Sequence, residues 1–190
     1  MKVIGITGNC NDQAESHVAI RLMADSSILL SNKPFFVPDF APQFVMHPAI
    51  ALRVNRLGKN VASRFAHRYY DSVAACVAVE ACGDNVDDRG DARFTAFDGA
   101  VMLGNYMPWS DMPESIETAV AINDAIVATT STAGMSHDFD HMIELVSTYF
   151  TIKMGDIIVN IDNSKSHVLT IGQNLTATIG GKPSLKIRIK

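Results

Sequence analysis

Histidines carry the chemistry that is easiest to recognise in this sequence. His137 and His141 are four residues apart, which on a helix is one turn, the spacing of two-histidine metal sites. No Glu follows His137, so the His-Glu-x-x-His pattern is absent, and His137 precedes the core of the predicted helix. We therefore predict a solvent-exposed helix start here. A histidine-based transition-metal site that includes His47 stays open as an alternative.

Other catalytic patterns are missing from the chain. Gly5, Thr7 and Gly8 end the first predicted strand, but neither GxGxxG nor GK[ST] is present, so we predict no phosphate-binding loop. The serines have no His and Asp in a recognisable triad context. A serine hydrolase is therefore not predicted.

The element that would position functional residues spans residues 139–163. Apolar residues recur at steps of three and four from Phe139 to Phe150, which predicts an amphipathic helix capped by Asp138 or Asp140. Gly155 marks a turn, and residues 157–159 form an apolar run typical of a strand buried on both faces. Such an arrangement brings the residues after the strand to the rim of a sheet.

Composition limits the class of protein. The chain has 190 residues, 47% of them hydrophobic and 19% charged, as expected for one globular domain. A net charge of −4 without a basic run argues against nucleic acid as a partner, and no apolar run is long enough to span a membrane. The three cysteines form no recognisable disulfide framework, and the N-terminus does not resemble a signal peptide, so we predict a cytoplasmic protein.

The remaining elements are mostly strands. We predict a strand over 2–7 and a helix over about 13–24, which together make an N-terminal lead-in of about 45 residues. The hairpin signals are Asn123-Asp124-Ala125 and Gly180-Gly181. The charged stretch 82–93 has no apolar face and reads as an exposed loop. Further strands are predicted at 27–30, 49–54, 73–81, 119–122, 126–129, 174–179 and 185–189.

Five ordered motifs together resemble the fumarylacetoacetate hydrolase family, which includes acylpyruvate hydrolases, fumarylpyruvate hydrolases and 2-hydroxyhepta-2,4-diene-1,7-dioate isomerases. The resemblance covers nearly the whole chain and implies one domain, 1–190, with a mostly β fold, a few helices (α+β) and a rolled mixed β-sheet, or β-roll, that is commonly dimeric. The motifs are NKPFFVPDF (32–40), FAHRYYD (65–71), AFDGAVMLGNYMPW (96–109), Thr132-x-x-Met135 and YFTIKMGDIIV (149–159).

The resemblance also implies a divalent cation, Mg²⁺ or Mn²⁺, held by a Glu-x-Glu pair and a later Asp. Such a hard cation needs several anionic oxygens, and it then polarises a carbonyl or enol oxygen of the substrate. The matching positions here carry His47, Ala49 and Ala78. Glu80 or Asp71 could supply only one carboxylate, so we predict no cofactor.

Other functional positions of the family also differ in this sequence. The His-x-x-Glu catalytic pair falls on Gln13 and Ser16, and Gln cannot act as a general base at neutral pH. A lysine before the Phe-Asp-Gly motif falls on Thr95. The Thr-Gly-Thr-Pro loop that holds the substrate carboxylate is replaced by 160–163, where the charge of Asp162 would repel a carboxylate. We therefore predict a vestigial pocket, formed by Gln13, His47, Glu80, Thr95, Asn160 and Asp162.

These features predict a non-catalytic member of the family, a pseudoenzyme that pairs with a second copy of itself or with an active relative. Two alternatives stay open. One is a binding module that recognises a small, less anionic molecule without metal. The other is an active hydrolase or isomerase of acylpyruvate-like or 2-hydroxy-diene-dioate substrates whose altered site uses His47, Glu80 or the histidines at 137 and 141.

Overall fold

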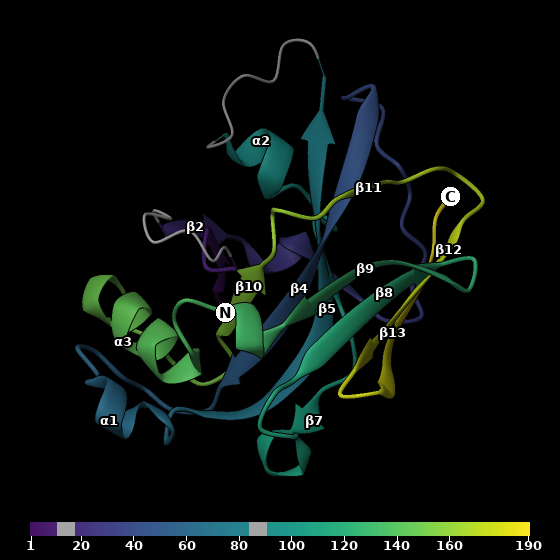
Figure 1. Ribbon diagram of the computed structural model, residues 1–190. Coiled ribbons are helices and arrows are strands. Elements are labelled where there is room, and N and C mark those ends of the chain that lie inside the picture. The colour runs from purple at the N-terminus through teal and green to yellow at the C-terminus, as the bar shows by residue number, and fades with distance from the viewer. Residues whose placement is uncertain (11–17, 84–90) are drawn as a thin grey trace.

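The computed structural model describes residues 1–10, 18–83 and 91–190, and it consists of two β-sheets with short helices around them (Figure 1). The larger sheet has the strand order β2 (Ala19–Met23), β1 (Val3–Thr7), β10 (Ile157–Ile161), β4 (Gln43–Val54), β5 (Tyr70–Cys82), β6 (Val101–Leu103) and β3 (Ile28–Leu30). Short strands β11 (His167–Val168) and β7 (Met107–Pro108) pair with β4 and β5.

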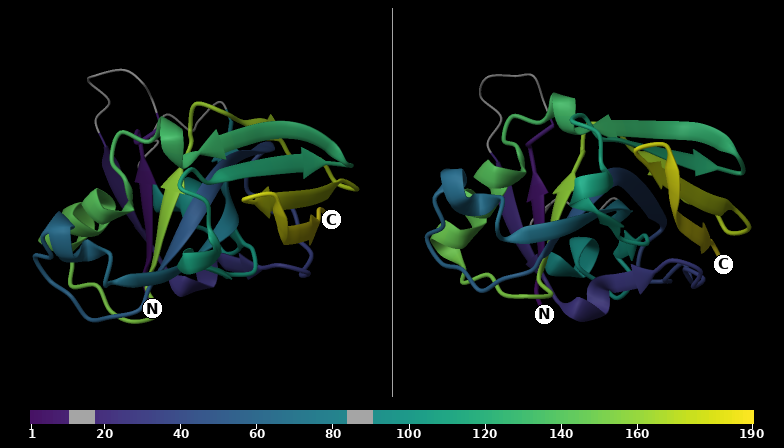
Figure 2. Two further views of the ribbon diagram at one scale, coloured as in Figure 1. Left: turned by 60° about the horizontal axis from the view of Figure 1, so that its bottom comes forward. Right: turned by 90° about the horizontal axis from the view of Figure 1, so that it is seen from below.

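The smaller sheet has the order β13 (Lys182–Arg188), β12 (Asn174–Ile179), β8 (Glu117–Ile122) and β9 (Ala125–Ser131). The α-helices are α1 (Ser63–Ala66), α2 (Ala92–Thr95) and α3 (Phe139–Tyr149), and 3-10 turns span Asp25–Ser27, Trp109–Asp111 and Thr132–Gly134. Figure 2 shows α1 and α3 side by side at one end of the molecule and the smaller sheet at the other. No helix among the described residues has the length and apolar character to cross a membrane.

The larger sheet is mixed and curls back on itself. β1 is parallel to β10 and β3 is parallel to β6, while the other pairs are antiparallel. β2 and β3 lie at opposite ends of the strand order, yet only residues 24–27 join them. The sheet must therefore curl into a half-barrel, which confirms the expected mostly β, rolled mixed sheet.

Two apolar clusters cover the two faces of this sheet. On the outer face, Ile4, Ile6 and Ile158 belong to one core with the apolar side of α3 and with the smaller sheet. On the inner face of the half-barrel, β4 and β5 contribute small buried residues, which suits a tight curl because inner side chains converge. These small residues are Ala49, Ala51, Ala74, Cys76 and Ala78.

The helix–turn–strand unit forms as the sequence predicts. Asp138 caps α3, accepting a hydrogen bond from the His141 amide at 2.9 Å. Gly155 turns the chain with φ +87°, a conformation that favours glycine, and all of β10 is buried. The two predicted hairpins also form, with positive φ at both central residues of each turn: Asn123, Asp124, Gly180 and Gly181.

The predicted helix over 13–24 is wrong for the part that the structure describes. Residues 19–23 form β2, an antiparallel neighbour of β1 with Arg21 opposite Gly5. The physical reason is that the open edge of β1 needs partners for its backbone N–H and C=O groups, a need that the apolar spacing of Val18 and Leu22 does not reveal. Residues 11–17, including Gln13 and Ser16, lie outside the described residues.

The stretch 82–93 is described only at its ends. β5 continues to Cys82, and Asp91 caps α2 by accepting a hydrogen bond from the Arg93 amide at 2.8 Å. Residues 92 and 93 are therefore helical rather than part of a loop. Residues 84–90 lie outside the described part of the chain.

Candidate functional site

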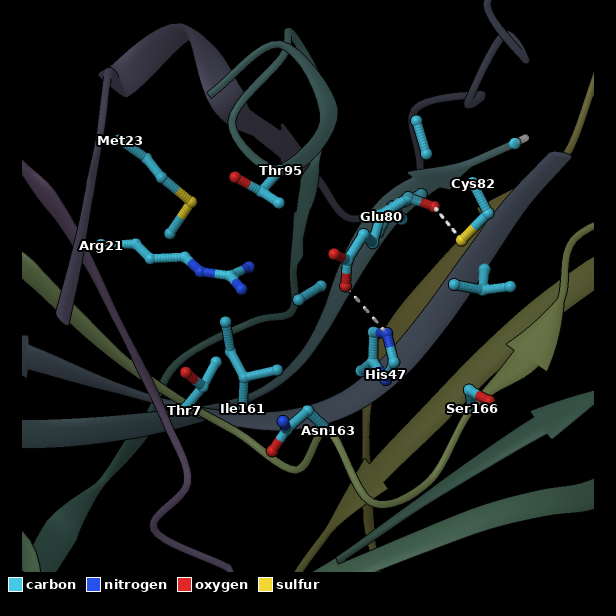
Figure 3. Close-up of a pocket in the computed structure, with 15 residues that line it drawn as sticks. Thr7, Arg21, Met23, His47, Glu80, Cys82, Thr95, Ile161, Asn163 and Ser166 are labelled. Atoms are coloured by element: carbon cyan, nitrogen blue, oxygen red, sulfur yellow. Dashed lines mark hydrogen bonds and ion pairs between the residues drawn. The ribbon is translucent and has the colours of Figure 1, made fainter. Parts of the chain in front are cut away.

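A cavity of about 390 Å³ opens on the inner face of the half-barrel (Figure 3). Side chains alternate between the two faces of a strand, and this alternation directs residues from β2, β1, β10, β4 and β5 into the cavity. Thr95 of α2 and the loop after β10 complete the wall. The polar side chains that line it are Thr7, Arg21, His47, Glu80, Thr95, Asn163 and Ser166.

His47 is the best-defined polar group in the cavity. Its residue is only 8% exposed, and its Nδ1 lies 2.8 Å from the carbonyl oxygen of Lys165. A carbonyl only accepts, so Nδ1 carries the hydrogen and donates it. The other ring nitrogen, Nε2, lies 3.5 Å from Oε2 of Glu80 and has no hydrogen-bond partner among the described residues.

Arg21 brings a positive charge into the same cavity. Its side chain extends from β2 toward the strands that carry His47 and Glu80 (Figure 3). Its guanidinium makes no hydrogen bond or ion pair with any residue that the structure describes. Arg21 is not among the pocket residues predicted from the sequence, because the prediction placed this stretch on a helix. The signal that could have found it is the alternation of Ile20, Arg21 and Leu22 beside an apolar strand.

The structure brings together several of the residues predicted to form the vestigial pocket. His47 lies directly opposite Ala78, and both reach the cavity with Glu80 and Thr95. Ala49 is on the same face of β4 but is fully buried in the inner cluster. The positions that the family resemblance assigns to the metal ligands therefore share one face of the sheet.

Asn160 and Asp162 do not line this cavity. Asn160 pairs with Ile6 in the register of β10 and β1, so it points to the outer face, where it contacts Asn9 and Cys10. Asp162 is 2% exposed. Its carboxylate accepts hydrogen bonds from the backbone and hydroxyl of Ser164 and forms an ion pair with Lys165 at 3.3 Å.

The expectation that Asp162 repels an anion is therefore wrong, because its charge is buried and compensated inside its own loop. Asn163 lines the cavity instead. Asp71 also lies outside the cavity, at the exposed start of β5, where it pairs with Arg53 at 3.0 Å. Of the two carboxylates considered as a third metal ligand, only Glu80 reaches the site.

His137, which precedes α3, and His141, in its first turn, lie apart from this cavity. His141 is exposed and its Nδ1 contacts Asp138 at 2.8 Å, while Nδ1 of His137 is buried without a hydrogen-bond partner among the described residues. The predicted solvent-exposed helix start therefore agrees with the exposed His141, but not with the buried Nδ1 of His137. No group of three or more His, Cys, Asp or Glu that could hold a metal occurs in the described part of the chain.

Comparison with known proteins gives the family. Residues 9–188 match the family described as fumarylacetoacetate (FAA) hydrolase, C-terminal. The chain belongs to the fumarylacetoacetate hydrolase family. Among curated proteins it is similar to the mitochondrial oxaloacetate tautomerase fahd-1 of Caenorhabditis elegans, with 23% identity over 142 residues and 70% of this chain. The match spans 65% of that relative, slightly less than two thirds of its length.

Solved structures share the fumarylacetoacetate hydrolase fold with this chain. A 5-carboxymethyl-2-hydroxymuconate delta-isomerase from Mycobacterium smegmatis has a TM-score of 0.90 at 21% identity, covering 99% of this chain and 76% of its own. A fumarylpyruvate hydrolase from Pseudomonas aeruginosa, in complex with Mn²⁺ and pyruvate, has a TM-score of 0.86 at 11% identity, covering 100% and 89%. At these identities the likeness establishes the fold.

The cavity residues that the structure describes do not fit the Mg²⁺ or Mn²⁺ ion that the fumarylacetoacetate hydrolase family implies. Mg²⁺ takes an octahedron of hard oxygen ligands, anchored by carboxylates. Ala49 and Ala78 have no donor atoms, so among the described residues of the cavity the imidazole of His47 and one carboxylate, Glu80, remain. The guanidinium of Arg21 adds a positive charge that opposes a second cation in the same cavity.

Proposed function

We propose that this chain is a non-catalytic member of the fumarylacetoacetate hydrolase family, a pseudoenzyme that does not carry out the family's cation-dependent hydrolase or isomerase reaction. The observation that carries the proposal is the donor set of the cavity. At the three positions where the resemblance places carboxylates, the chain has one imidazole and two methyl groups. Without a bound cation, the Lewis-acid step of the family reaction has no electrophile.

The residues proposed to replace the catalytic acid and base support the same conclusion from sequence. Gln13 and Ser16 stand where the resemblance places His and Glu, and neither side chain can take up a proton at neutral pH. Thr95 stands where the resemblance places a lysine before the Phe-Asp-Gly motif, so the positive charge of that lysine is absent at this position. In the structure its hydroxyl donates a hydrogen bond to the Asp91 carbonyl at 3.2 Å.

The proposal includes a protein partner, a second copy of this chain or an active relative. Supporting it, the end of the half-barrel away from His47 carries an apolar hollow lined by Ile28, Leu30, Leu103 and Ile157, with Leu30 55% exposed. The described cysteines are free thiols, as a reducing cytoplasm would keep them, and a cytoplasmic location is part of the proposal.

A second candidate is an enzyme with altered chemistry. It is favoured by the position of His47, which lines the cavity with its Nε2 3.5 Å from the Glu80 carboxylate, because a histidine beside a carboxylate is a common general acid–base pair. Replacing His47 with Gln would abolish such an activity. In the non-catalytic protein the same replacement has no turnover to remove.

The deciding experiment is calorimetric titration of chelator-treated protein with Mg²⁺, Mn²⁺ and Zn²⁺, paired with turnover assays on oxaloacetate and fumarylpyruvate. We expect no binding of Mg²⁺ or Mn²⁺ at about millimolar concentration, where a single carboxylate binds poorly, and no turnover. Stoichiometric Mn²⁺ binding with turnover would overturn the proposal. Binding of Zn²⁺ alone, with activity lost in His47→Gln, would favour the second candidate.

A further inference from the structure

We propose that a second, basic hollow binds a small molecule through a diphosphate group. The segment between β4 and β5 forms this hollow beside α1, and its volume is about 420 Å³. It shares no lining residue with the cavity that contains His47. We call it the basic hollow. The polar and aromatic residues that line it are Arg56, Lys59, Asn60, Phe65, Arg68 and Tyr69.

The charge of the basic hollow is of one sign. Arg56, Lys59 and Arg68 line it, and no carboxylate does so among the described residues. None of the three forms an ion pair with a residue that the structure describes. The whole chain has a net charge of −4, so this is a local concentration of positive charge. Like charges gathered in one place repel each other, and a bound anion relieves that repulsion.

Aromatic rings hold the two arginines of the basic hollow. The Cζ atom of Arg56 lies 5.8 Å from the ring centroid of Tyr69, and that of Arg68 lies 5.5 Å from the ring centroid of Phe65. Both distances are within the range of cation–π contacts. A guanidinium that lies over a ring uses its flat face there and keeps its in-plane N–H groups free to donate. Such a fork matches two oxygens of a phosphate group.

Other arginines show how this chain completes a guanidinium within the protein. Arg53 and Arg93 also lie over aromatic rings. Each of them has a carboxylate partner as well, Asp71 at 3.0 Å and Asp91 at 2.6 Å. The two arginines of the basic hollow have the ring but no carboxylate among the described residues. Their in-plane donors are therefore available to an anion from outside the chain.

The wall of the basic hollow is fixed by its neighbours. Gly58 exchanges two backbone hydrogen bonds with Ile152, each of 2.9 Å. A Cβ on Gly58 would lie 2.5 Å from the ring of Tyr69, so the backbone packs directly against that ring. Lys59 is anchored too, because its Nζ donates to the Thr148 carbonyl at 2.9 Å and keeps further N–H groups. A site held in this way loses little conformational freedom when a ligand binds.

Charge and size together select the ligand class. A diphosphate group carries several negative charges at neutral pH, which three cations can offset, whereas a monocarboxylate carries only one. The ring of Phe65 is 42% exposed and offers apolar surface to an organic group attached to the diphosphate. A hollow of about 420 Å³ suits a small molecule rather than a polymer.

Three probes test the proposal: pyrophosphate, ADP and adenosine. Their affinities are measured by calorimetric titration of the full chain at low ionic strength, where exposed charges are little screened, and in chelator, so that no cation bridges the phosphates. We expect pyrophosphate and ADP to bind, and adenosine to bind at least about tenfold more weakly than ADP because it lacks the charged group. Tighter binding of ADP than of pyrophosphate would identify a nucleotide-like ligand, and equal binding would identify the diphosphate group alone.

Variants assign the binding to the basic hollow. Arg56→Met and Arg68→Met should each weaken ADP binding by about tenfold, the effect of losing one charge-assisted contact at an exposed site. Arg188→Met, on the exposed side of β13, removes the same charge elsewhere and should change the affinity by less than about twofold. Arg21→Met should also leave it unchanged, since Arg21 lines the other cavity. Circular dichroism spectra check that each variant is folded.

Several results would overturn the inference. These are no binding of pyrophosphate and ADP, equal binding of adenosine and ADP, and unchanged affinity in both Arg56→Met and Arg68→Met. Binding that is lost in Arg21→Met alone would place the anion beside His47 instead. Tighter binding of a single-stranded octanucleotide than of ADP would indicate nucleic acid rather than a small molecule. None of these results depends on the metal titration, so the inference and the proposed function fail independently.

Discussion

Asn9 and Asn160 are 151 residues apart in the chain and hydrogen-bond to each other at 2.9 Å, both with no exposed surface. Asn9 follows β1 and Asn160 belongs to the parallel neighbour β10. The amide of Asn9 also exchanges two hydrogen bonds with the backbone of His137, at 2.9 and 2.8 Å. One buried side chain therefore ties the edge of the half-barrel to the start of α3.

Replacing Asn9 with Ala should destabilise the fold. The change leaves the N–H and C=O of His137 and the Oδ1 of Asn160 without partners in a buried place, and each unpaired buried group costs about 1–3 kcal/mol. We expect a loss of about 3 kcal/mol in the free energy of unfolding, measured by urea denaturation. The exposed Asn105→Ala is the control and should change it by less than about 0.5 kcal/mol. Similar values for both variants would contradict the structural role.

Gly104 marks a close approach between the two sheets. A Cβ at this position would lie 2.3 Å from Oγ of Ser184 and 2.8 Å from the carbonyl oxygen of Ala75. Ser184 cannot simply move aside, because its hydroxyl accepts from the Ala75 amide and donates to the Asn105 carbonyl. Gly104→Ala should therefore cost about 2–3 kcal/mol of stability through overpacking.

The matched control for that change is Gly134→Ala. A Cβ there meets nothing within 4 Å, and the backbone needs no positive φ. Since alanine restricts the unfolded chain more than glycine does, this variant should be neutral or up to about 1 kcal/mol more stable. Thermal unfolding of the two variants side by side checks the prediction, which fails if Gly104→Ala melts no lower than Gly134→Ala.

Asp138 and His141 give α3 a contribution to stability that depends on pH. The hydrogen bond that the His141 ring donates to the Asp138 carboxylate, and then the charge of that carboxylate, raise the pKa of His141. Partial burial raises the pKa of Asp138, but the backbone and side-chain hydrogen bonds from His141 outweigh it and lower the value. The stability that the raised pKa of His141 contributes is therefore fully present below the unfolded pKa of His141. It is lost as pH rises through the folded pKa. The stability that the lowered pKa of Asp138 contributes is fully present above the unfolded pKa of Asp138. It is lost as pH falls through the folded pKa.

Asp138→Asn tests this pairing, because Asn still caps a helix but carries no charge. The pKa of His141, followed by NMR, should fall in the variant. The stability gap to the unchanged protein should be widest between about pH 4 and about pH 6.5 and shrink on either side. Asp138→Ala also removes the helix cap, so its free energy of unfolding should be lower than that of Asp138→Asn by about 1 kcal/mol at every pH. An unchanged His141 titration in Asp138→Asn would refute the interaction.

Local chemistry made much of the fold readable from the sequence. The Asn-Asp and Gly-Gly turns fix two hairpins because few other residues tolerate positive φ, and the spacing of Phe139, Met142 and Ile143 allows one helix face to be buried. These signals lie within a few residues of each other. The resemblance to the family then predicted the rolled, mostly β fold, and the match over residues 9–188 confirmed the family.

Residues 19–23 show where such reading fails. Their apolar spacing fits a helix as well as a strand. The strand is selected by pairing with the open edge of β1. A local pattern of apolar residues does not reveal that edge, although β1 is close in sequence and in space. Because a helix was predicted where β2 forms, the predicted pocket did not include Arg21, which brings a positive charge to the cavity.

The sequence by itself determined which chemical groups the chain has: no carboxylate at 47, 49 or 78, one imidazole, and a charged residue at 162. Tertiary structure decided which of them meet. Strand register placed His47 and Glu80 on one face and turned Asn160 to the other. The reason is geometric: one residue along a strand reverses the direction of a side chain, so only pairing with distant strands settles which groups share a cavity.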